Sequence, residues 1–284
     1  MLASDQALLT GILIGFAALL GLLVGSFLNV VIYRVPLGKS IVSPPSSCPS
    51  CGERIRGWDN IPVLSWVLLR GKCRTCGLPI SARYPLIEAS SAVLFGFVGA
   101  RFLAPIAEAG VDAAFVASTA IVGVAFLHFA AISIALAAID LDTHRLPNVL
   151  TLPSYIVAIV LFAIAALLSG DWSGLLRSVI AGAALFAAYF AMAFAYPQGM
   201  GLGDVKLAGL IGVYLGWLGW GSVIVGAFGA FVLGGAFSVF LIATRRAGRK
   251  SGIPFGPWML AGAFVGVFFG EHLWTGYLGL VGLS

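Results

Sequence analysis

Long apolar segments are the feature that most constrains how this chain folds. A helix that crosses a bilayer needs roughly 20 mostly apolar residues. Six single stretches of this kind run from Leu8 to Ile32, Leu86 to Leu103, Ala113 to Ile139, Val149 to Leu168, Ser178 to Tyr196 and about Phe255 to Gly270. A further stretch, from Leu207 to Ala243, contains no charged residue and is long enough for two crossings, with a turn between Gly216 and Gly221. The sequence therefore predicts an all-α polytopic membrane protein with about eight transmembrane helices in a lipid bilayer.

Composition and the placement of basic residues support this prediction and set an orientation. Of the 284 residues, 60% are hydrophobic and only 10% are charged, which excludes an ordinary water-soluble domain. Lys and Arg concentrate in the cytoplasmic loops of membrane proteins, near the spans. If both termini lie outside the cytoplasm, only Arg101 and Arg177 of the 16 Lys and Arg lie toward the outer side, which leaves 14 in cytoplasmic segments. The net charge of +5 is therefore a signal of orientation, and we expect no nucleic-acid partner.

One extramembrane segment is large enough to fold by itself. It runs from Arg34 to about Arg83 and contains all four cysteines. No basic residue precedes the first apolar segment and no small-residue cleavage pattern follows it, so we expect a retained helix there and not a secretory signal. We therefore divide the chain into a first transmembrane helix (1–33), a cytoplasmic loop domain (34–85) and a seven-helix membrane domain (86–284).

The four cysteines form two C-x2-C pairs, CPSCG at Cys48 and Cys51 and CRTCG at Cys73 and Cys76. A two-residue gap lets both thiolates of a pair reach one ion, and the glycine after each pair permits the turn that this needs. Two pairs complete the tetrahedral sulfur shell of a structural zinc site. Two disulfides are the alternative, but a cytoplasmic loop lies in a reducing compartment. We expect a zinc-ribbon-like loop between the first two helices, in which Zn²⁺ stabilises the fold and performs no hydrolysis.

Two aspartates lie at the cytoplasmic ends of separate predicted helices. Asp140 ends the third crossing in IDLDTHRLPN, and Asp204 precedes the sixth crossing in GMGLGDVKL. Ionisable residues at membrane depth are costly and mark functional sites. Two crossings separate Asp140 from Asp204, one outward and one back, so both return to the same face at similar depth. Two carboxyl groups that share a site resist ionising together, so one deprotonates a water while the protonated one polarises a carbonyl, as in aspartic proteases.

Gly201 and Gly203 precede Asp204 in the G-x-G-D motif. Without side chains they let an extended substrate backbone approach the aspartate, and they allow turns that are closed to other residues. The alternative is a flexible loop with a capping aspartate at the start of a helix. Two other functions stay open at this point. One is an ion or proton-coupled transporter that uses the intramembrane aspartates, and the other is a membrane scaffold whose cysteine loop docks a cytoplasmic partner.

Six motifs, in order, resemble those of the type IV prepilin peptidase family across nearly the whole chain. They are GSFLNVVIYRVP, CPSCG, NIPVLSWVLLRGKCRTCGLPISARYPLIE, IDLDTHRLPN, GMGLGDVKL and IPFGPWMLAG. The resemblance implies a bifunctional enzyme: a G-x-G-D-type intramembrane aspartic peptidase that cleaves basic leaders from prepilins and pseudopilins, and an N-methyltransferase that uses S-adenosylmethionine on the new N-terminal residue. It also implies a bacterial inner-membrane location, with the active site at the cytoplasmic side.

Matched residue by residue, the family's two catalytic aspartates are similar in position to Asp140 and Asp204. We interpret Asp142, two residues after the first, as a solvated charge at the helix end. The sequence departs from the commonest family form at Asn148, where many relatives have Asp after the proline. This removes one acidic contact for a basic leader and leaves the peptidase chemistry intact. Lys206 either holds its helix at the membrane interface or offsets negative charge at the aspartate pair.

No glycine-rich nucleotide fingerprint locates a methyl donor in this sequence. The resemblance associates methyl transfer with the cysteine loop, which shorter peptidase-only relatives lack. Glu88 and Asn29 flank that loop and are candidates for lining a methyltransferase pocket with it. Their alternative roles are a helix-end carboxylate paired with Arg83 or another base, and an amide hydrogen-bonded between helices.

Overall fold

The computed structural model of the chain describes residues 3–107, 112–197, 199–244 and 253–282. Four basic residues that the predicted orientation places in a cytoplasmic loop lie outside these ranges: Arg245, Arg246, Arg249 and Lys250. The described part of the chain is helical, with turns and two isolated β-bridges but no strand.

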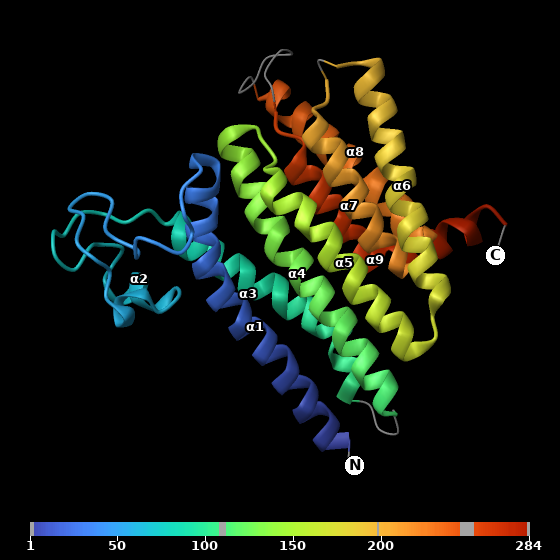
Figure 1. Cartoon of the computed structure of the whole chain (residues 1–284), viewed down its shortest axis with the longest axis horizontal. Helices are drawn as coiled ribbons and strands as arrows, with labels where there is room; N and C mark the ends of the chain where they lie inside the picture. Colours follow the sequence, from blue (N-terminus) through green and yellow to red (C-terminus); the bar gives the residue numbers. More distant parts are fainter. Residues whose placement is uncertain (1–2, 108–111, 198, 245–252, 283–284) are drawn as a thin grey trace. The chain divides into compact units, whose positions relative to one another are not determined.

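Eight long helices occupy the described residues. Their bounds are α1 (Ala3–Arg34), α3 (Arg83–Phe102), α4 (Ala113–Thr143), α5 (Asn148–Ser169), α6 (Trp172–Ala195), α7 (Leu202–Leu218), α8 (Trp220–Ala243) and α9 (Gly256–Leu280). Between α1 and α4 lie the short helix α2 (Leu64–Leu68) and three 3-10 turns, η1 (Val35–Leu37), η2 (Gly57–Asn60) and η3 (Ala104–Ala107). Every predicted crossing coincides with one of the eight long helices (Figure 1).

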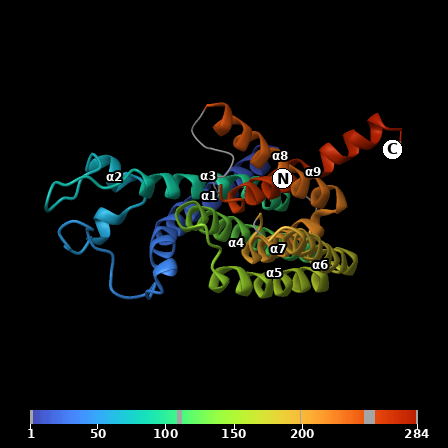
Figure 2. The same cartoon turned by 90° about the horizontal axis from the view of Figure 1, so that it is seen from above.

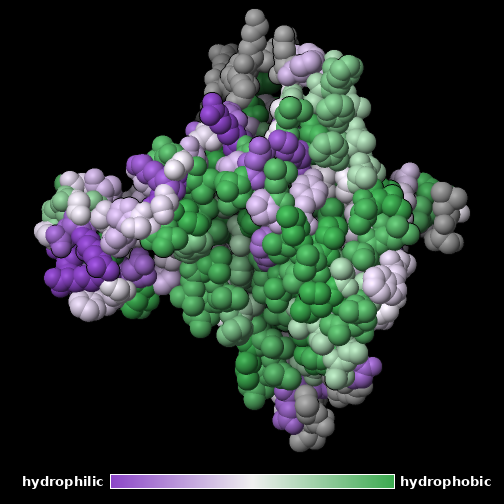
Figure 3. Space-filling model, in the orientation of Figure 1, coloured by the Kyte–Doolittle hydropathy of each residue, from purple (hydrophilic) through white to green (hydrophobic). Residues whose placement is uncertain are grey.

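The helices have the length and the surface of membrane-spanning segments. Six of them, α1, α3, α4, α5, α6 and α8, are long and apolar enough to cross a membrane. The 17 residues of α7 are at the lower limit of about 17 for a span, and α9 has 25 residues. Large apolar side chains face outward, as Phe16, Phe194 and Phe228 do, and the hydrophobic colour covers the helices in Figure 3. Such a surface is unfavourable in water, and the prediction of an all-α polytopic membrane protein is confirmed.

The first compact unit of the chain comprises residues 1–135. In it, α1 and α3 lie side by side along their length (Figure 1). A Cβ on Gly25 would lie 2.8 Å from the Cα of Glu88, and a Cβ on Gly99 would lie 2.8 Å from the Cβ of Ala17. Small residues at these positions therefore let the two helices approach closely. The loop that carries α2 extends from the ends of α1 and α3 (Figure 2). The predicted boundaries at residues 33 and 85 stay a prediction.

The second compact unit comprises residues 136–284, and α7 is its central helix. This helix packs against α5, α6, α8 and α9, and eleven of its 17 residues are buried. Glycines bring it close to α6, because a Cβ on Gly212 would lie 2.8 Å from the Cα of Gly182. The packing on four helices fixes the position of the α7 N-terminus, where Asp204 lies.

Two charged side chains cap the break between α7 and α8. The break falls at Gly219, whose φ of 151° favours glycine, so the predicted turn between Gly216 and Gly221 is confirmed. Arg177 of α6 donates from Nε to the Gly216 carbonyl at 2.6 Å, at the C-terminal end of α7. Glu271 of α9 accepts a 3.2 Å hydrogen bond from the Ser222 N–H, in the first turn of α8. Each charge has the sign that the helix dipole favours at that end.

Candidate active site and metal centre

Asp140 lies in the last turn of α4 and is only 5% exposed. Its Oδ2 accepts a 3.1 Å hydrogen bond from the backbone N–H of Gly256, the first residue of α9. A helix N-terminus carries partial positive charge and stabilises a carboxylate placed there. A Cβ on residue 256 would lie 2.6 Å from that oxygen, so glycine leaves the space that the bond needs. The motif IPFGP thus supplies a partner for Asp140 that sequence reasoning did not identify.

Asp204 is the third residue of α7 and is half-buried. Its Oδ2 accepts a 3.1 Å hydrogen bond from the N–H of Gly201, the residue just before the helix. This bond satisfies a backbone donor at the start of α7, as a capping carboxylate does. It also fixes the direction of the Asp204 side chain at this end of the helix.

The two glycines of the G-x-G-D motif do not take special backbone conformations. Gly201 has φ −85° and ψ 157°, which any residue adopts, and Gly203 lies inside α7. The expectation that they form turns closed to other residues is therefore wrong. Space is the restriction at Gly203, because a Cβ there would lie 3.2 Å from the Cβ of Leu146. The access that these glycines give to a substrate backbone stays a prediction.

Leu146 connects the surroundings of the two aspartates within the second unit. On one side it contacts Gly203, the residue before Asp204. On another side it contacts Gly256, because a Cβ on that residue would lie 3.4 Å from the leucine Cδ2. Gly256 is the residue whose N–H donates to Asp140. The carboxyl groups of Asp140 and Asp204 are close enough to interact electrostatically. The structure thus brings the two predicted catalytic residues together around one side chain of the RLPN segment, which sequence reasoning did not single out.

Lys206 links α7 to the start of α5. Its Nζ donates a 3.0 Å hydrogen bond to the side-chain oxygen of Asn148, the first residue of α5. The Tyr155 hydroxyl, about two turns further along α5, donates to the Lys206 carbonyl at 2.6 Å. Asn148 and Tyr155 of α5 therefore both bond Lys206, one at its side chain and the other at its carbonyl. Asp142 and Asp140 differ in burial, because the side chain of Asp142 is exposed and that of Asp140 is buried.

Both C-x2-C pairs adopt the same turn in the first unit. The Cys48 N–H donates to the Glu53 carbonyl at 2.9 Å, and the Gly52 N–H donates back to the Cys48 carbonyl at 2.9 Å. Cys73 and Gly77 repeat this pattern in the second pair. The two glycines have φ of 72° and 69°, which a residue with a Cβ rarely adopts. The predicted role of a glycine after each pair is confirmed.

The four cysteines form an arrangement that can bind one metal ion. Their sulfur atoms all lie within 4.8 Å of one another, and the Sγ atoms of Cys48 and Cys76 are 3.9 Å apart. A tetrahedral ion with metal–sulfur bonds of ~2.3 Å separates its sulfurs by ~3.8 Å. A disulfide needs a separation of ~2.05 Å, and the four cysteines are free thiols. The geometry therefore fits a metal ion and does not fit two disulfides.

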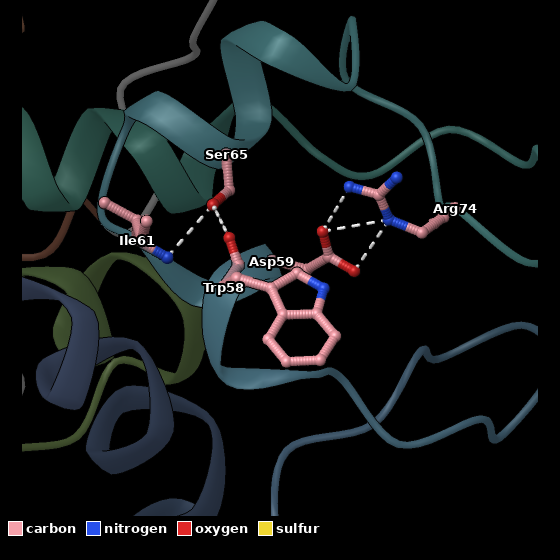
Figure 4. Close-up of polar contacts among 5 residues, drawn as sticks. All are labelled: Trp58, Asp59, Ile61, Ser65 and Arg74. Carbon is pink, nitrogen blue, oxygen red and sulfur yellow. Dashed lines mark hydrogen bonds and ion pairs between the residues drawn. The ribbon is translucent and has the colours of Figure 1, made fainter.

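An ion pair holds the second cysteine pair against the turn η2. Arg74, which follows Cys73, donates from Nε to Asp59 Oδ2 at 2.9 Å and from Nη2 to Oδ1 at 2.6 Å (Figure 4). Such two-pronged contacts are the stronger form of arginine–carboxylate pairing. The hydrogen bond from Arg74 keeps the pKa of Asp59 below its ordinary value. In the same view the Ser65 hydroxyl donates to the Trp58 carbonyl and accepts from the Ile61 N–H, which closes the turn.

Glu88 and Asn29 lie on the two helices that flank the cysteine loop. Asn29 of α1 donates to the Tyr84 carbonyl of α3 at 3.2 Å, so its amide does form an interhelical hydrogen bond. Glu88 of α3 is 8% exposed, and its Oε2 accepts a 2.7 Å hydrogen bond from the Val63 N–H in the loop. Asn29 therefore joins the two helices to each other, and Glu88 ties the loop to α3.

The fold and these two groups of residues define a class of protein: a polytopic membrane protein with a carboxyl pair at the ends of two helices and four cysteines that can bind a metal in an extramembrane loop. The family follows from sequence comparison. The model described as the type IV leader peptidase family matches residues 127–239, and the model of the bacterial peptidase A24 N-terminal domain matches residues 19–102. The chain belongs to the type IV leader peptidase family.

Curated relatives cover almost the whole chain. A prepilin leader peptidase/N-methyltransferase of Burkholderia pseudomallei (strain 1026b) is 35% identical, over 95% of this chain and 89% of its own length. Proteins of the same name from Pseudomonas putida and Neisseria gonorrhoeae are 32% and 31% identical, over 95% of this chain and 95% and 96% of their own lengths. No solved structure matches the chain.

Proposed function

We propose that this protein is a membrane aspartic endopeptidase that removes the leader peptide from type IV prepilins and pseudopilins and then N-methylates the new N-terminal residue. The observation that carries the peptidase proposal is that Asp140 of α4 and Asp204 of α7 are close enough to interact electrostatically. Leu146 lies beside both Gly256, which hydrogen-bonds Asp140, and Gly203, which precedes Asp204. The names of the relatives supply the substrate class.

The aspartate pair performs peptide hydrolysis in two proton transfers. The ionised carboxylate takes a proton from a water molecule, whose oxygen attacks the scissile carbonyl carbon while the protonated carboxyl donates a hydrogen bond to the carbonyl oxygen. The C–N bond then breaks, and the amine leaves with a proton from the aspartate pair. Backbone N–H groups of Gly256 and Gly201 hold the two carboxyl groups in place during these transfers.

The test is cleavage of a synthetic prepilin by the purified protein, followed by mass spectrometry of the products. Asp140→Asn and Asp204→Asn are expected to lower the cleavage rate by a factor of about 10² to 10⁴, since each removes one acid–base group. Asp142→Asn is the matched control, because it makes the same change at an exposed position in the same helix end. Cleavage by both Asn variants at the wild-type rate would falsify the assignment.

No observation favours the ion-transport alternative. The relatives described above are named as enzymes and give it no support. The scaffold alternative is separated from the peptidase by the same cleavage test, since a scaffold tolerates both aspartate substitutions.

We propose Zn²⁺ as the ion held by Cys48, Cys51, Cys73 and Cys76. Four thiolates in a tetrahedral shell are typical of structural zinc. The ion would cross-link the two C-x2-C turns. The chain itself positions the four thiols through the two glycine turns and the Asp59–Arg74 ion pair. Metal analysis of the purified protein is expected to find one zinc per chain.

The methyl group would come from S-adenosylmethionine, the donor that the family resemblance implies. A product mass increased by one methyl group, in the cleavage assay with donor added, is the expected result. A cleaved product without this increase would limit the protein to the peptidase activity.

We further propose that the protein lies in the bacterial inner membrane with both termini outside the cytoplasm and the aspartate pair at the cytoplasmic side. The distribution of Lys and Arg supports this orientation. Prepilin leaders are basic and remain on the cytoplasmic side, so the site and its substrate then share one compartment.

A further inference from the structure

Five large apolar side chains are exposed at one corner of the cysteine loop. On α2, Leu64, Val67 and Leu68 have the spacing of a single helix face, and each is at least half exposed. Trp58 of the turn η2 is 65% exposed, and Ile61 just after it is 48% exposed. We call these five residues the apolar corner. A contiguous apolar surface is unfavourable in water and marks a site of interaction.

Hydrogen bonds within the loop hold this corner in shape. The Ser65 hydroxyl donates to the Trp58 carbonyl and accepts from the Ile61 N–H, both at 3.0 Å, so η2 is folded onto α2 (Figure 4). The Trp66 Nε1–H donates to the Ile80 carbonyl at 3.0 Å and joins α2 to the end of the loop. The backbone of the segment is thus fixed by the loop itself, and the five apolar side chains remain exposed.

The apolar corner lies beside the helices α1 and α3 and not beyond their ends. The Val63 N–H, just before α2, donates to Glu88 of α3 at 2.7 Å. Glu88 in turn packs on Gly25 of α1, where a Cβ would lie 2.8 Å from its Cα. Gly25 lies nine residues before Arg34, the end of α1, which corresponds to a rise of about 13 Å. In Figure 1 and Figure 2 the loop projects to one side of this helix pair.

Exposed apolar side chains of the two helices reach the same level. Leu86 of α3 is 63% exposed, and Tyr33 in the last turn of α1 is 61% exposed. In a membrane protein, such side chains on a spanning helix contact lipid. Leu86 precedes Glu88 by two residues, and Glu88 is bonded to the residue before α2. Lipid that contacts α3 at Leu86 is therefore at the depth of the apolar corner.

The charge of the loop is complementary to anionic lipid. Residues 34–83 contain eight Lys and Arg and two Asp and Glu, a net charge of +6. A zinc ion with four thiolates would add −2 and leave +4. Arg56 lies over the Trp58 ring at 5.8 Å, and Arg70 follows α2 and is exposed. Long basic side chains keep their charge at the headgroups while apolar neighbours enter the interface. A basic prepilin leader, by contrast, is repelled by this charge.

We propose that the apolar corner inserts into the interfacial layer of the bilayer that holds α1 and α3, with the surrounding Arg and Lys on anionic phospholipid headgroups. Tryptophan favours this layer, because its ring is apolar and its N–H is polar. The contact attaches the cysteine loop to the membrane at a third point, besides the chain's entries into the two helices. It does not depend on the peptidase or methyl-transfer activity proposed above.

Photocross-linking in a bilayer tests this contact on the full-length protein. The photoreactive residue p-benzoylphenylalanine is placed at Leu68, in nanodiscs of phosphatidylethanolamine and phosphatidylglycerol, and mass spectrometry identifies the adducts. Phospholipid adducts are expected in a yield about fivefold or more above that of the same probe at Glu53. Glu53 is the matched control, because it is an exposed residue of the same loop outside the apolar corner. Equal lipid yields at the two positions would overturn the proposal.

A second measurement uses the native tryptophans and places no probe in the corner. Fluorine NMR of protein labelled with 5-fluorotryptophan resolves the loop signals, which Trp58→Phe and Trp66→Phe assign. A spin label carried on lipid is expected to broaden the Trp58 signal more than the Trp66 signal, because Trp66 is bonded inside the loop. A gadolinium chelate in water should leave the Trp58 signal sharp. A Trp58 signal that is broadened by the chelate and not by the lipid label would contradict insertion.

Lipid composition and the identity of the adducts separate the other occupants. With phosphatidylcholine as the only lipid, the yield at Leu68 is expected to fall about twofold or more, since the anionic headgroups are lost. An unchanged yield would overturn the headgroup contact. Adducts to added prepilin, to residues 136–284 or to a second copy of the chain, formed in place of lipid adducts, would overturn the proposal. Metal content equal to wild type checks that the loop of each variant is folded.

Discussion

At the scale of single residues, the contact between Lys206 and Asn148 links two helices through a charged donor and a neutral acceptor. The amide oxygen accepts the lysine hydrogen bond at 3.0 Å, so the link between α5 and α7 is kept without a second charge. Asp204 lies two residues before this lysine, so the link also fixes the start of the helix that carries it.

Variants at residue 148 test this link. Asn148→Ala removes the acceptor and is expected to lower the free energy of unfolding by about 1 kcal/mol. Asn148→Asp makes the hydrogen bond charge-assisted and is expected to raise it by about 0.5 kcal/mol, as for a partly exposed ion pair. Thermal unfolding in detergent should therefore place the Ala variant lowest and the Asp variant highest. In a Lys206→Met background the gain from Asp should vanish, and a gain that persisted there would contradict the proposed pairing.

Glu271 is a second residue whose role depends on a partner far away in the sequence. Its carboxylate accepts the Ser222 N–H in the first turn of α8, where a negative charge is favourable. Glu271→Gln keeps a hydrogen-bond acceptor and loses the charge, whereas Glu271→Ala loses both. We expect the alanine variant to lower the free energy of unfolding by about 1 kcal/mol or more. The expected order of thermal stability is wild type, then Gln, then Ala. His272→Gln, at the next position, is the control and should be close to wild type; an Ala variant as stable as wild type would show that the cap contributes nothing.

At the scale of elements, the positions of the helices could be predicted because their cause is local. Each span is a run of apolar residues, and each end is marked by charge, proline or glycine, so all eight predicted crossings coincide with helices. The two C-x2-C-G turns were also predictable, because residue type and spacing alone determine them. By contrast, Glu271 and Arg177 look like ordinary charges outside the membrane until α8 and α7 are placed beside them.

In the candidate active site, too, some features could be predicted and others could not. Asp140 and Asp204 could be paired from topology, since two crossings return the chain to one face. The residues that contact them could not be predicted, because Gly256 lies on α9 and Leu146 contacts Gly203 and Gly256 only after the helices pack. The conformational role assigned to Gly201 failed because a glycine in a sequence motif does not reveal whether space or backbone angle requires it.

The cysteine loop should behave as an element whose fold depends on its metal. Removing one ligand with Cys48→Ser or Cys73→Ser leaves an incomplete shell, so we expect loss of zinc and rapid proteolysis between residues 35 and 82. The long helices do not depend on these thiols and should stay protected. Limited proteolysis with mass spectrometry, alongside metal analysis, measures both effects. Ser50→Ala changes a residue between the first two cysteines and should leave zinc and protection unchanged. Equal protease resistance in the metal-free variants would contradict a structural role for the ion.

At the scale of the whole molecule, the distribution of charge along the chain makes the orientation testable. The exposed apolar side chains of the helices are compatible with either orientation, because contact with lipid does not distinguish the two sides of a membrane. The 14 Lys and Arg assigned to cytoplasmic segments, out of 16, provide the preference. An odd number of crossings up to Asp140 then places the aspartate in the compartment opposite to both termini.

Reporter fusions to the chain in bacteria measure this orientation directly. Alkaline phosphatase is active only outside the cytoplasm. Green fluorescent protein fluoresces when the fusion leaves it in the cytoplasm, and it does not fluoresce when the general secretory route exports it. A phosphatase fused after Ser284 is expected to be active, and one fused after His144, close to Asp140, is expected to be inactive, with the fluorescent fusions giving the reverse. Replacing the basic residues of one cytoplasmic loop should weaken the preference, since positive charge near the spans determines it. An active phosphatase after His144 would place the aspartate pair on the wrong side for a leader that is retained in the cytoplasm, and the peptidase would then need a substrate of different topology.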